Sequence, residues 1–579
     1  MKYPILSEMN TSREWLDTFG GYNHNLKIGE GEFYEMKNLS SDNYPILSPR
    51  PKRGVAYTPS KPQGMVAKDA LCYVDGGDFV INEYRVAMEL TEDDTPKTLV
   101  SMGAYVIIMP DKKYINTADL SDYGPIEATV KTTGTVSFTL CKVDGIDYDN
   151  VTTSDTQPYE PNNMDLWLDT SSEPHSLKQY STTSEMWSTI ATTYIKISAT
   201  GIGKPFNVND GVLLSGIKSA DLADLNASMV IWAKGDNYIV VRGILDRLEE
   251  QTEEVTVTRA MPNMDFIVES ENRLWGCRYG AAINGEIVNE IYASKLGDFK
   301  NWNCFMGIST DSYAASVGTD GQFTGAITHL GYPIFFKENY LHKVYGNYPA
   351  NYQIQTTACR GVQKECGKSL AIVNEVLYYK ARSGICAYDG SLPTEISSAL
   401  GDMSYSKAVA GALGNKYYVS MCDTSEDYHL FVYDTLKGMW HREDDTQATD
   451  FCNCRGDLYY IDYADNQIKT VRGTGVKEDG PIKWEAVTGI IGTDSPDKKY
   501  ISRMEVRMKL DVGSRVVFYV EYDSSGEWEH LFAMTGKNIQ SFPVPIKPRR
   551  CDHLRLRMMG EGDAKIFSIC KTVEWGSDK

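Results

Sequence analysis

The chain has 579 residues, and its 58 Lys and Arg against 78 Asp and Glu give a formal net charge of −20. Hydrophobic residues make up 42% and charged residues 23%, which excludes a mostly disordered chain. The negative net charge disfavours a protein whose main function is to bind nucleic-acid phosphates or anionic lipid, because both functions need a positively charged surface. The 37 Tyr outnumber the 17 Phe and 10 Trp together, which favours strands.

The sequence contains no apolar run near the roughly 20 residues that a membrane-spanning helix needs. Its first residues lack the long apolar stretch of a secretory signal. The 12 cysteines are too sparse for a disulfide scaffold, so we expect free thiols and folding in a reducing cytoplasm.

The first segment, residues 1–57, is polar and ends in a proline-punctuated stretch. Pro45, Pro49 and Pro51 cannot all lie in a central strand, so this stretch belongs at an edge or surface. Residues 12–19 and 219–226 are the two places where the pattern predicts short helical turns. We expect the segment to contribute to the architecture described next and to contacts between subunits.

Short strands rich in aromatic residues, separated by turns containing Gly, Asn and Asp, recur over residues 58–125 and again over 261–478. The unit of turn, strand, turn and strand returns about every 40 to 50 residues, which is the spacing of four-stranded propeller blades. The pattern predicts an all-β protein with a β-propeller of about seven blades, two before the middle of the chain and five after it.

Two other regions differ in composition and residue pattern from the propeller segments. Residues 126–260 are richer in Thr and Ser, and we interpret them as a small antiparallel β-barrel inserted at a surface loop of the propeller. Residues 479–579 contain long alternating stretches that predict a C-terminal β-sandwich with one solvated face.

The sequence carries no signature of an enzyme, cofactor or metal site. No two of the eight histidines lie within five positions, so no histidine pair has zinc-ligand spacing. Cys452 and Cys454 are too close together for the usual zinc spacing, and we expect both side chains to be buried in a core. Asp444 and Asp445 are adjacent, so on a strand they would face opposite sides and make a poor glycosidase pair. Residues 433–440 and 522–528 share an Asp, Gly and Trp order that predicts tight turns.

Two proline-stiffened basic loops are candidate contact sites. We expect their cations to pair with carboxylates of a neighbouring subunit or domain, since the chain as a whole is acidic. The residues are Arg50, Lys52 and Arg53 in the first loop and Lys547, Arg549 and Arg550 in the second.

Three groups of residues carry a resemblance to a known family. They are residues 19–23 (FGGYN) with 31–40 (GEFYEMKNLS) and 44–50 (YPILSPR), residues 271–277 (ENRLWGC) with 291–302 (IYASKLGDFKNW), and residues 378–390 (YYKARSGICAYDG). Together they resemble the β-propeller nozzle or hub proteins of short-tailed bacteriophages, over roughly the propeller part of the chain.

The resemblance implies a non-enzymatic structural protein of a virion tail, made in the host cytoplasm. Such a protein would form a homo-oligomeric ring, usually sixfold, would contact other tail or portal-adaptor proteins, and would take part in tail assembly and genome ejection. Double-stranded DNA would pass through its lumen without specific binding, which an acidic wall would favour. The alternatives are a receptor- or glycan-binding tail protein that uses exposed aromatic residues and, more weakly, a propeller glycosidase.

Overall fold

The computed structural model describes residues 11–282, 285–492, 498–546 and 549–575. Strands dominate, and helical structure among the described residues is limited to four 3-10 turns, η1 (Ala223–Leu225), η2 (Pro349–Asn351), η3 (Gly367–Ser369) and η4 (Ser398–Leu400). None of these helices is long and apolar enough to cross a lipid bilayer. The predicted all-β class is confirmed.

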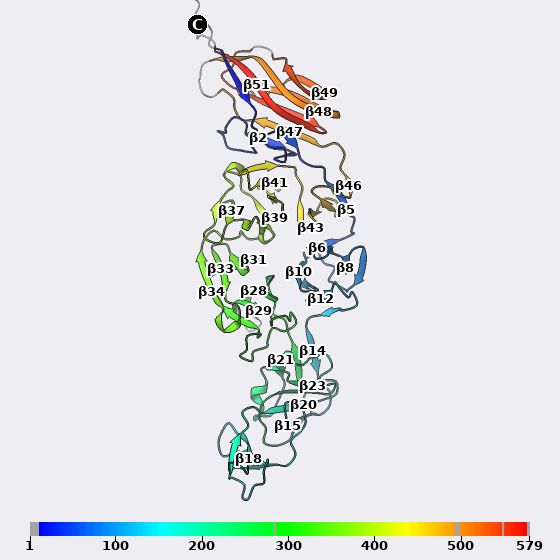
Figure 1. Cartoon of the computed structure of the whole chain (residues 1–579), viewed down its shortest axis with the longest axis vertical. Helices are drawn as coiled ribbons and strands as arrows, with labels where there is room; N and C mark the ends of the chain where they lie inside the picture. The colour runs from blue at the N-terminus through cyan, green and yellow to red at the C-terminus, as the bar shows by residue number, and fades with distance from the viewer. Residues whose placement is uncertain (1–10, 283–284, 493–497, 547–548, 576–579) are drawn as a thin grey trace, which may run out of the picture. The chain divides into compact units, whose positions relative to one another are not determined.

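Seven sheets in the described ranges are successive antiparallel blades of a β-propeller (Figure 1). The first two contain β6 (Pro62–Ala67), β7 (Leu71–Asp75), β8 (Asp78–Ile81) and β9 (Tyr84–Ala87), then β10 (Thr98–Met102), β11 (Tyr105–Met109), β12 (Lys113–Asn116) and β13 (Tyr123–Pro125). The third and fourth contain β27 (Phe266–Ser270), β28 (Arg273–Ala281), β29 (Ile287–Ala293) and β30 (Tyr313–Ser316), then β31 (Phe323–His329), β32 (Tyr332–Lys337), β33 (Tyr340–Tyr345) and β34 (Gln353–Ala358).

The fifth blade contains β35 (Ala371–Val373), β36 (Val376–Lys380), β37 (Ile385–Tyr388) and β38 (Thr394–Glu395). The sixth contains β39 (Ser406–Leu413), β40 (Lys416–Cys422), β41 (Tyr428–Asp434) and β42 (Met439–Arg442). The seventh joins β43 (Ala448–Cys454), β44 (Asp457–Asp462) and β45 (Ile468–Thr470) to β5 (Gly54–Tyr57) and β46 (Lys477–Glu478). The last blade therefore takes a strand from the first segment of the chain, and the predicted blade number is confirmed.

The residues form two compact units. One comprises residues 1–96, 336–341 and 357–579, and here the first strands β35, β39, β43 and β6 of successive blades contact one another in that order. The apolar core between the seventh and first blades includes Cys452, Cys454, Met65 and Tyr73. Both close cysteines are thus buried, as their spacing predicted.

The other unit comprises residues 97–335 and 342–356 and contains the inserted domain. Entry strand β14 (Ala128–Lys131) pairs with exit strand β26 (Thr256–Arg259), so the two ends of the insertion lie side by side. The domain has three sheets in its described residues, and the first has the strand order β14, β26, β21 (Gly211–Ser215), β22 (Ser228–Val230). The second has the order β23 (Ala233–Gly235), β24 (Tyr238–Arg242), β20 (Tyr194–Ser198), β15 (Val136–Cys141), β25 (Glu249–Gln251). The third has the order β16 (Val151–Ser154), β17 (Leu166–Asp169), β18 (Ser176–Ser181), β19 (Met186–Thr189). The first two sheets share one core, which contains Phe138, Ile197, Val257 and other apolar residues.

The C-terminal sandwich is built on β48 (Lys499–Tyr522), a strand of 24 residues. The first half of β48 pairs with β51 (Ala564–Trp575), the second half pairs with β50 (Leu554–Glu561), and β49 (Glu529–Val544) runs along its other side. Strand β47 (Lys483–Thr488) extends the sheet beside β50. Period-two burial along β48 explains why this long segment forms a strand.

Two strands from the start of the chain complete this sandwich. Strand β1 (Thr11–Leu16) pairs with β51, and β2 (Phe33–Lys37) pairs with β47 (Figure 1). The short hairpin of β3 (Leu39–Ser40) and β4 (Ser48–Pro49) follows. The predicted helical turn over residues 12–19 is wrong, because residues 11–16 alternate between exposed and half-buried positions along the edge of the sheet. The predicted helix over 219–226 is reduced to η1.

Candidate functional site

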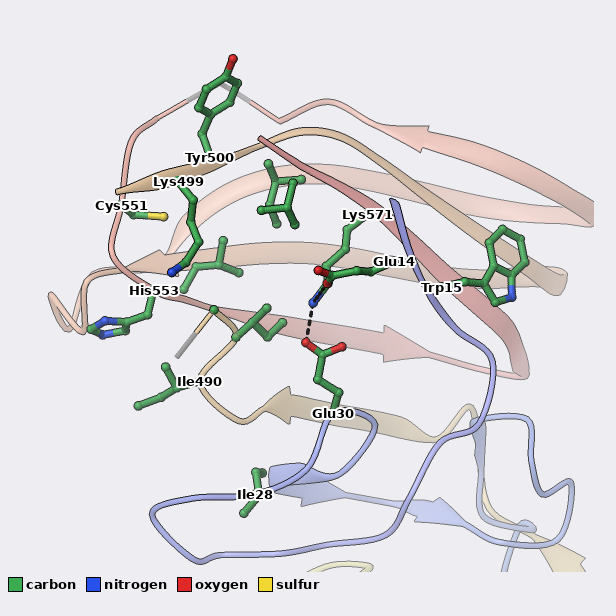
Figure 2. Close-up of a pocket in the computed structure, with 15 residues that line it drawn as sticks. Glu14, Trp15, Ile28, Glu30, Ile490, Lys499, Tyr500, Cys551, His553 and Lys571 are labelled. Atoms are coloured by element: carbon green, nitrogen blue, oxygen red, sulfur yellow. Dashed lines mark hydrogen bonds and ion pairs between the residues drawn. The ribbon is translucent and has the colours of Figure 1, made fainter. Parts of the chain in front are cut away.

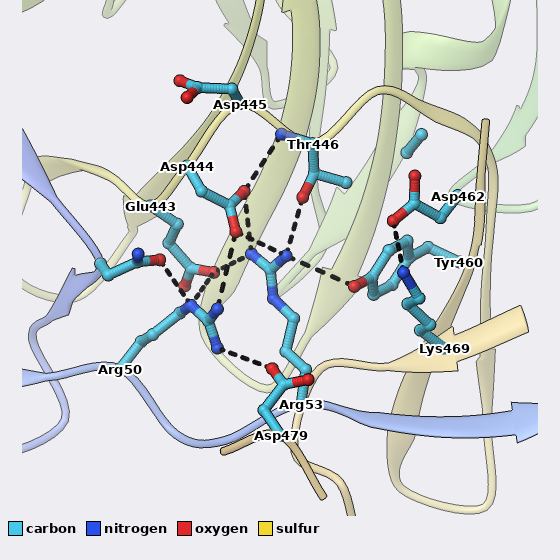
Figure 3. Close-up of polar contacts among 12 residues, drawn as sticks. Arg50, Arg53, Glu443, Asp444, Asp445, Thr446, Tyr460, Asp462, Lys469 and Asp479 are labelled. Atoms are coloured by element: carbon cyan, nitrogen blue, oxygen red, sulfur yellow. Dashed lines mark hydrogen bonds and ion pairs between the residues drawn. The ribbon is translucent and has the colours of Figure 1, made fainter. Parts of the chain in front are cut away.

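The two arginines of the first basic loop, Arg50 and Arg53, are buried within the fold. Arg53 is buried and donates to Glu443 Oε2 at 2.6 Å, and it lies 2.9 Å from Asp444 Oδ2 (Figure 3). Arg50, also buried, donates to Asn38 Oδ1 at 2.8 Å and lies 3.6 Å from Asp444 Oδ2. Although burial favours the neutral acid, the two guanidinium groups lower the pKa of Asp444.

This arginine cluster ties residues 50–53 to the connection between the sixth and seventh blades. Both arginines pair with carboxylates of the same chain, so their charges are satisfied without a second subunit. The adjacent Asp445 is also engaged, because it contacts Lys37 at 2.8 Å and Arg442 at 2.7 Å.

The three other basic candidates that the structure describes, Lys52, Arg549 and Arg550, lie wholly or partly at the surface. Lys52 is 3.9 Å from Glu478 Oε2, and Arg549 donates to Glu529 at 2.8 Å while covering the ring of Tyr522. Arg550 is exposed, and Lys547 lies outside the described residues. A role for these four residues in subunit contacts stays a prediction.

The predicted tight turns are present. The buried carboxylate of Asp434 accepts hydrogen bonds from the backbone N–H groups of Leu436 and Lys437. Trp440 is buried in the same hairpin and donates its indole N–H to Ile396 O at 2.9 Å. This Asp and this Trp therefore stabilise the fold and do not face a ligand.

A polar cavity of about 480 Å³, which we name the blade pocket, lies beside the fifth blade. Its wall consists of the turn 381–384 between β36 and β37 and of the connection from β38 through η4 to β39. Four serines and several charged or amide side chains share this wall: Ser383, Ser397, Ser398, Ser404, Asn25, Lys380, Arg382, Glu395 and Asp402.

Hydrogen bonds hold this wall in place. The Ser397 hydroxyl accepts from the backbone N–H of Ile385 at 2.9 Å, and a Cβ on Gly384 would lie 2.0 Å from that hydroxyl oxygen. A larger residue at position 384 would therefore displace the side chains of Ser397 and Glu395 from the pocket wall. Arg360 donates to Glu395 Oε2 at 2.7 Å, and this charge-assisted hydrogen bond fixes the position of that carboxylate in the wall.

Lys380 is the last residue of β36 and is buried in the pocket wall. Its ammonium donates to Gln363 Oε1 at 2.8 Å and to Ala381 O at 2.6 Å. Burial lowers the pKa of this ammonium. Tyr405 supplies an aromatic side chain to the pocket, and burial raises its pKa to about 12.

A second cavity, of about 470 Å³, lies in the sandwich, and we name it the sandwich pocket (Figure 2). The ammonium of Lys571 lies 2.8 Å from Glu14 Oε2 and 2.6 Å from Glu30 Oε1. Much of the remaining wall is aliphatic: Ile28, Ile490, Ile491, Ile501, Leu554 and Val573. Burial raises the pKa of the Cys551 thiol, which also lines this pocket, to about 11.

Across the described ranges, no three His, Cys, Asp or Glu side chains are grouped so that they could hold a metal ion. Sequence reasoning missed the blade pocket. One signal was available, because residues 378–390 place a Lys and an Arg on either side of a strand-to-turn boundary. Most of the other lining residues follow in the connection 395–405, where their spacing matches no binding motif, and Asn25 lies far away in the sequence.

No protein-family model and no curated protein sequence matches the chain. Among solved structures, an exo-β-1,3-galactanase from Phanerochaete chrysosporium with galactose matches 53% of this chain and 94% of its own, at 8% identity and a TM-score of 0.23. A family 43 arabinoxylan arabinofuranohydrolase from Bacillus subtilis matches 54% of this chain and 95% of its own, at 7% identity and a TM-score of 0.17. An acylaminoacyl peptidase from Pyrococcus horikoshii matches 54% and 55%, at 10% identity and a TM-score of 0.23.

These comparisons contradict the resemblance to tail nozzle proteins, because the three similar structures are two glycoside hydrolases and a peptidase. The predictions that depended on that resemblance are wrong with it: a non-enzymatic structural protein of a tail, a place in the virion, and a role in genome ejection. At these identities and TM-scores the likeness transfers no residue, substrate or activity to this chain.

Proposed function

We propose that the chain recognises a saccharide in the blade pocket. The observation that carries the proposal is the lining, in which hydroxyl, amide, carboxylate and guanidinium groups converge on one cavity of about 480 Å³. A saccharide presents many hydroxyls, each of which donates and accepts, so its site needs both kinds of partner at close spacing. The cavity volume lies within the range of small-molecule sites.

The pocket supplies both kinds of partner. Glu395 and Asp402 accept hydrogen bonds, Arg382 donates them, and the serine hydroxyls can do either. Charged partners strengthen such bonds, so a few well-placed contacts would orient the ligand. The sandwich pocket is of similar volume, but six aliphatic side chains line it and its Lys571 is already paired with two glutamates. It suits a sugar less well.

Hydrolysis of a bound glycoside is the second candidate function. Glycosidases ordinarily act through two carboxyl groups, and Glu395 and Asp402 line the same cavity. Glu395, which accepts a hydrogen bond from Arg360, is the candidate base or nucleophile, and Asp402 is the candidate acid.

Binding is tested by titrating the full chain with a panel of neutral and acidic oligosaccharides in a calorimeter. We expect at least one to bind, and we expect Asp402→Ala to weaken that binding by roughly tenfold or more, since a hydrogen bond to a charged group contributes about 1.5–3 kcal/mol. Asp221→Ala, which removes an exposed carboxylate of the inserted domain, is the matched control and should leave affinity unchanged. Failure of every saccharide to bind at millimolar concentration would overturn the proposal.

Hydrolysis is tested separately by the release of reducing ends from each bound oligosaccharide. Glu395→Gln and Asp402→Asn should each lower kcat by about a hundredfold or more if these groups act as base and acid. If no bound saccharide is cleaved, the second candidate is excluded and the binding function stands.

A further inference from the structure

Two cations of the blade pocket lack a carboxylate partner. Neither Lys380 nor Arg382 forms an ion pair with any residue that the structure describes, although Arg360, in the connection between β34 and η3, pairs with Glu395. Lys380 is buried and Arg382 is exposed at the turn. The pocket therefore contains positive charge that the described part of the chain does not neutralise.

The Lys380 ammonium has hydrogen-bond acceptors for two of its three donors among the described residues, and both acceptors are neutral. An ammonium has three N–H donors, and two of these bond to the neutral oxygens Gln363 Oε1 and Ala381 O. A buried charge is costly unless it is paired, and neutral acceptors only partly replace lost water. A negative group entering the pocket would supply the missing counter-charge.

Neither carboxylate of the pocket forms an ion pair with Lys380 or Arg382 in the described structure, although the charge of Glu395 reaches Lys380. Glu395 is bonded to Arg360 at 2.7 Å, and Asp402 is exposed on the connection between η4 and β39. Arg382 has a planar guanidinium whose paired N–H groups match the two oxygens of a carboxylate, and its exposure leaves those groups accessible to a ligand.

We propose that the saccharide bound in the blade pocket is acidic, with a uronate carboxylate that pairs with Arg382 and approaches the Lys380 ammonium. This inference rests on the proposed function and narrows it to one class of sugar. The carboxylate would make charge-assisted hydrogen bonds in a partly desolvated site, where they are stronger than in bulk water.

The test compares pairs of ligands that differ only in charge. Oligomers of galacturonate, glucuronate and mannuronate, and the methyl ester of each, are titrated into the full chain by calorimetry. We expect at least one acid to bind about tenfold or more tightly than its ester, and we expect this preference to shrink as salt is raised from about 50 to about 500 mM. Arg382→Gln should remove most of the preference, whereas Arg549→Gln, on the sandwich, should retain it.

The outcomes separate the two proposals. If esters or neutral sugars bind as tightly as the acids, the proposal of an acidic ligand is overturned and the proposal of saccharide recognition stands. If an acid is preferred but Arg382→Gln keeps the full preference, the assignment to this pocket is overturned. If no saccharide of any kind binds, the proposed function itself fails. Lys380→Met, checked for folding by circular dichroism, should weaken binding of the acid more than that of the ester.

Discussion

Arg53 donates a hydrogen bond of 2.6 Å to Glu443 across 390 residues of sequence, and both side chains are buried (Figure 3). The pair links the first segment of the chain to the end of the sixth blade. Strand β5, which begins at Gly54, then enters the seventh blade. The ion pair and the sheet pairing therefore act at the same place to hold the start of the chain on the propeller.

Removing one member of this pair should be strongly destabilising. Arg53→Met leaves Glu443 and Asp444 buried with less counter-charge, and we expect a loss of about 3–5 kcal/mol in the free energy of unfolding. The double variant Arg53→Met with Glu443→Met should lose less than the sum of the single variants. Urea unfolding measures both effects.

Lys52→Met is the matched control, because Lys52 and Glu478 are exposed and 3.9 Å apart. An exposed pair contributes roughly 0–1 kcal/mol, so this variant should unfold close to the original midpoint. Equal losses for Lys52→Met and Arg53→Met would contradict the role given to the arginine cluster.

Buried His441 should make the protein sensitive to mild acid. Burial lowers the pKa of this imidazole from 6.5 to about 3, so between these values the unfolded chain binds a proton that the folded chain does not. Stability should therefore fall as the pH drops from about 6.5 towards 3. Each unit of difference corresponds to about 1.4 kcal/mol, which makes the full effect a few kcal/mol.

Thermal unfolding at about pH 7 and about pH 5, on either side of the ordinary imidazole pKa, measures this effect. The variant His441→Phe cannot take up the proton, so its midpoint should change less between the two pH values than that of the original chain. If the midpoint of the variant changed more between the two pH values than that of the original chain, groups other than His441 would dominate the loss of stability in acid.

The thiols should react slowly in the native protein. All 12 cysteines lie in the described ranges and are free, and Cys359 is the one that is partly accessible. Burial raises the pKa of Cys359 to about 11, so little thiolate exists even at this position near neutral pH. A thiol reagent should label at most one site quickly before denaturation and all 12 after it. Rapid native labelling that survives Cys359→Ser would refute this expectation.

The inserted domain should depend on Asp210. This buried carboxylate accepts from Arg259 Nη1 at 2.6 Å and from Asn301 Nδ2 at 3.0 Å, so it joins the exit strand of the domain to the loop after β29. Asp210→Ala leaves the buried guanidinium of Arg259 without its carboxylate partner, and we expect a loss of about 3–5 kcal/mol.

Differential scanning calorimetry would show this loss as a lower transition temperature. Asp221→Ala again serves as the control, because Asp221 pairs with Arg247 at the surface, where both side chains are more than half exposed. Similar shifts for the two variants would contradict a special role for Asp210.

The sequence by itself predicted the all-β class, the number of blades, the inserted domain and the terminal sandwich. These features follow from period-two alternation, aromatic strands and turn residues, which are local and repeat along the chain. The one local expectation that failed at the start of the chain, a helical turn over residues 12–19, failed because pairing with β51 overrode a weak helical preference.

The blade pocket and the arginine cluster were decided by the tertiary structure. The pocket joins Asn25, the turn 381–384 and the connection that contains Asp402. The cluster joins Arg53 to Glu443. Neither arrangement leaves a recognisable motif: Arg53 and Glu443 are 390 residues apart, and the pocket wall joins residues 380–405 to the distant Asn25. Charge pairing and cavity shape depend on distances in space, and those distances exist only once the sheets have packed.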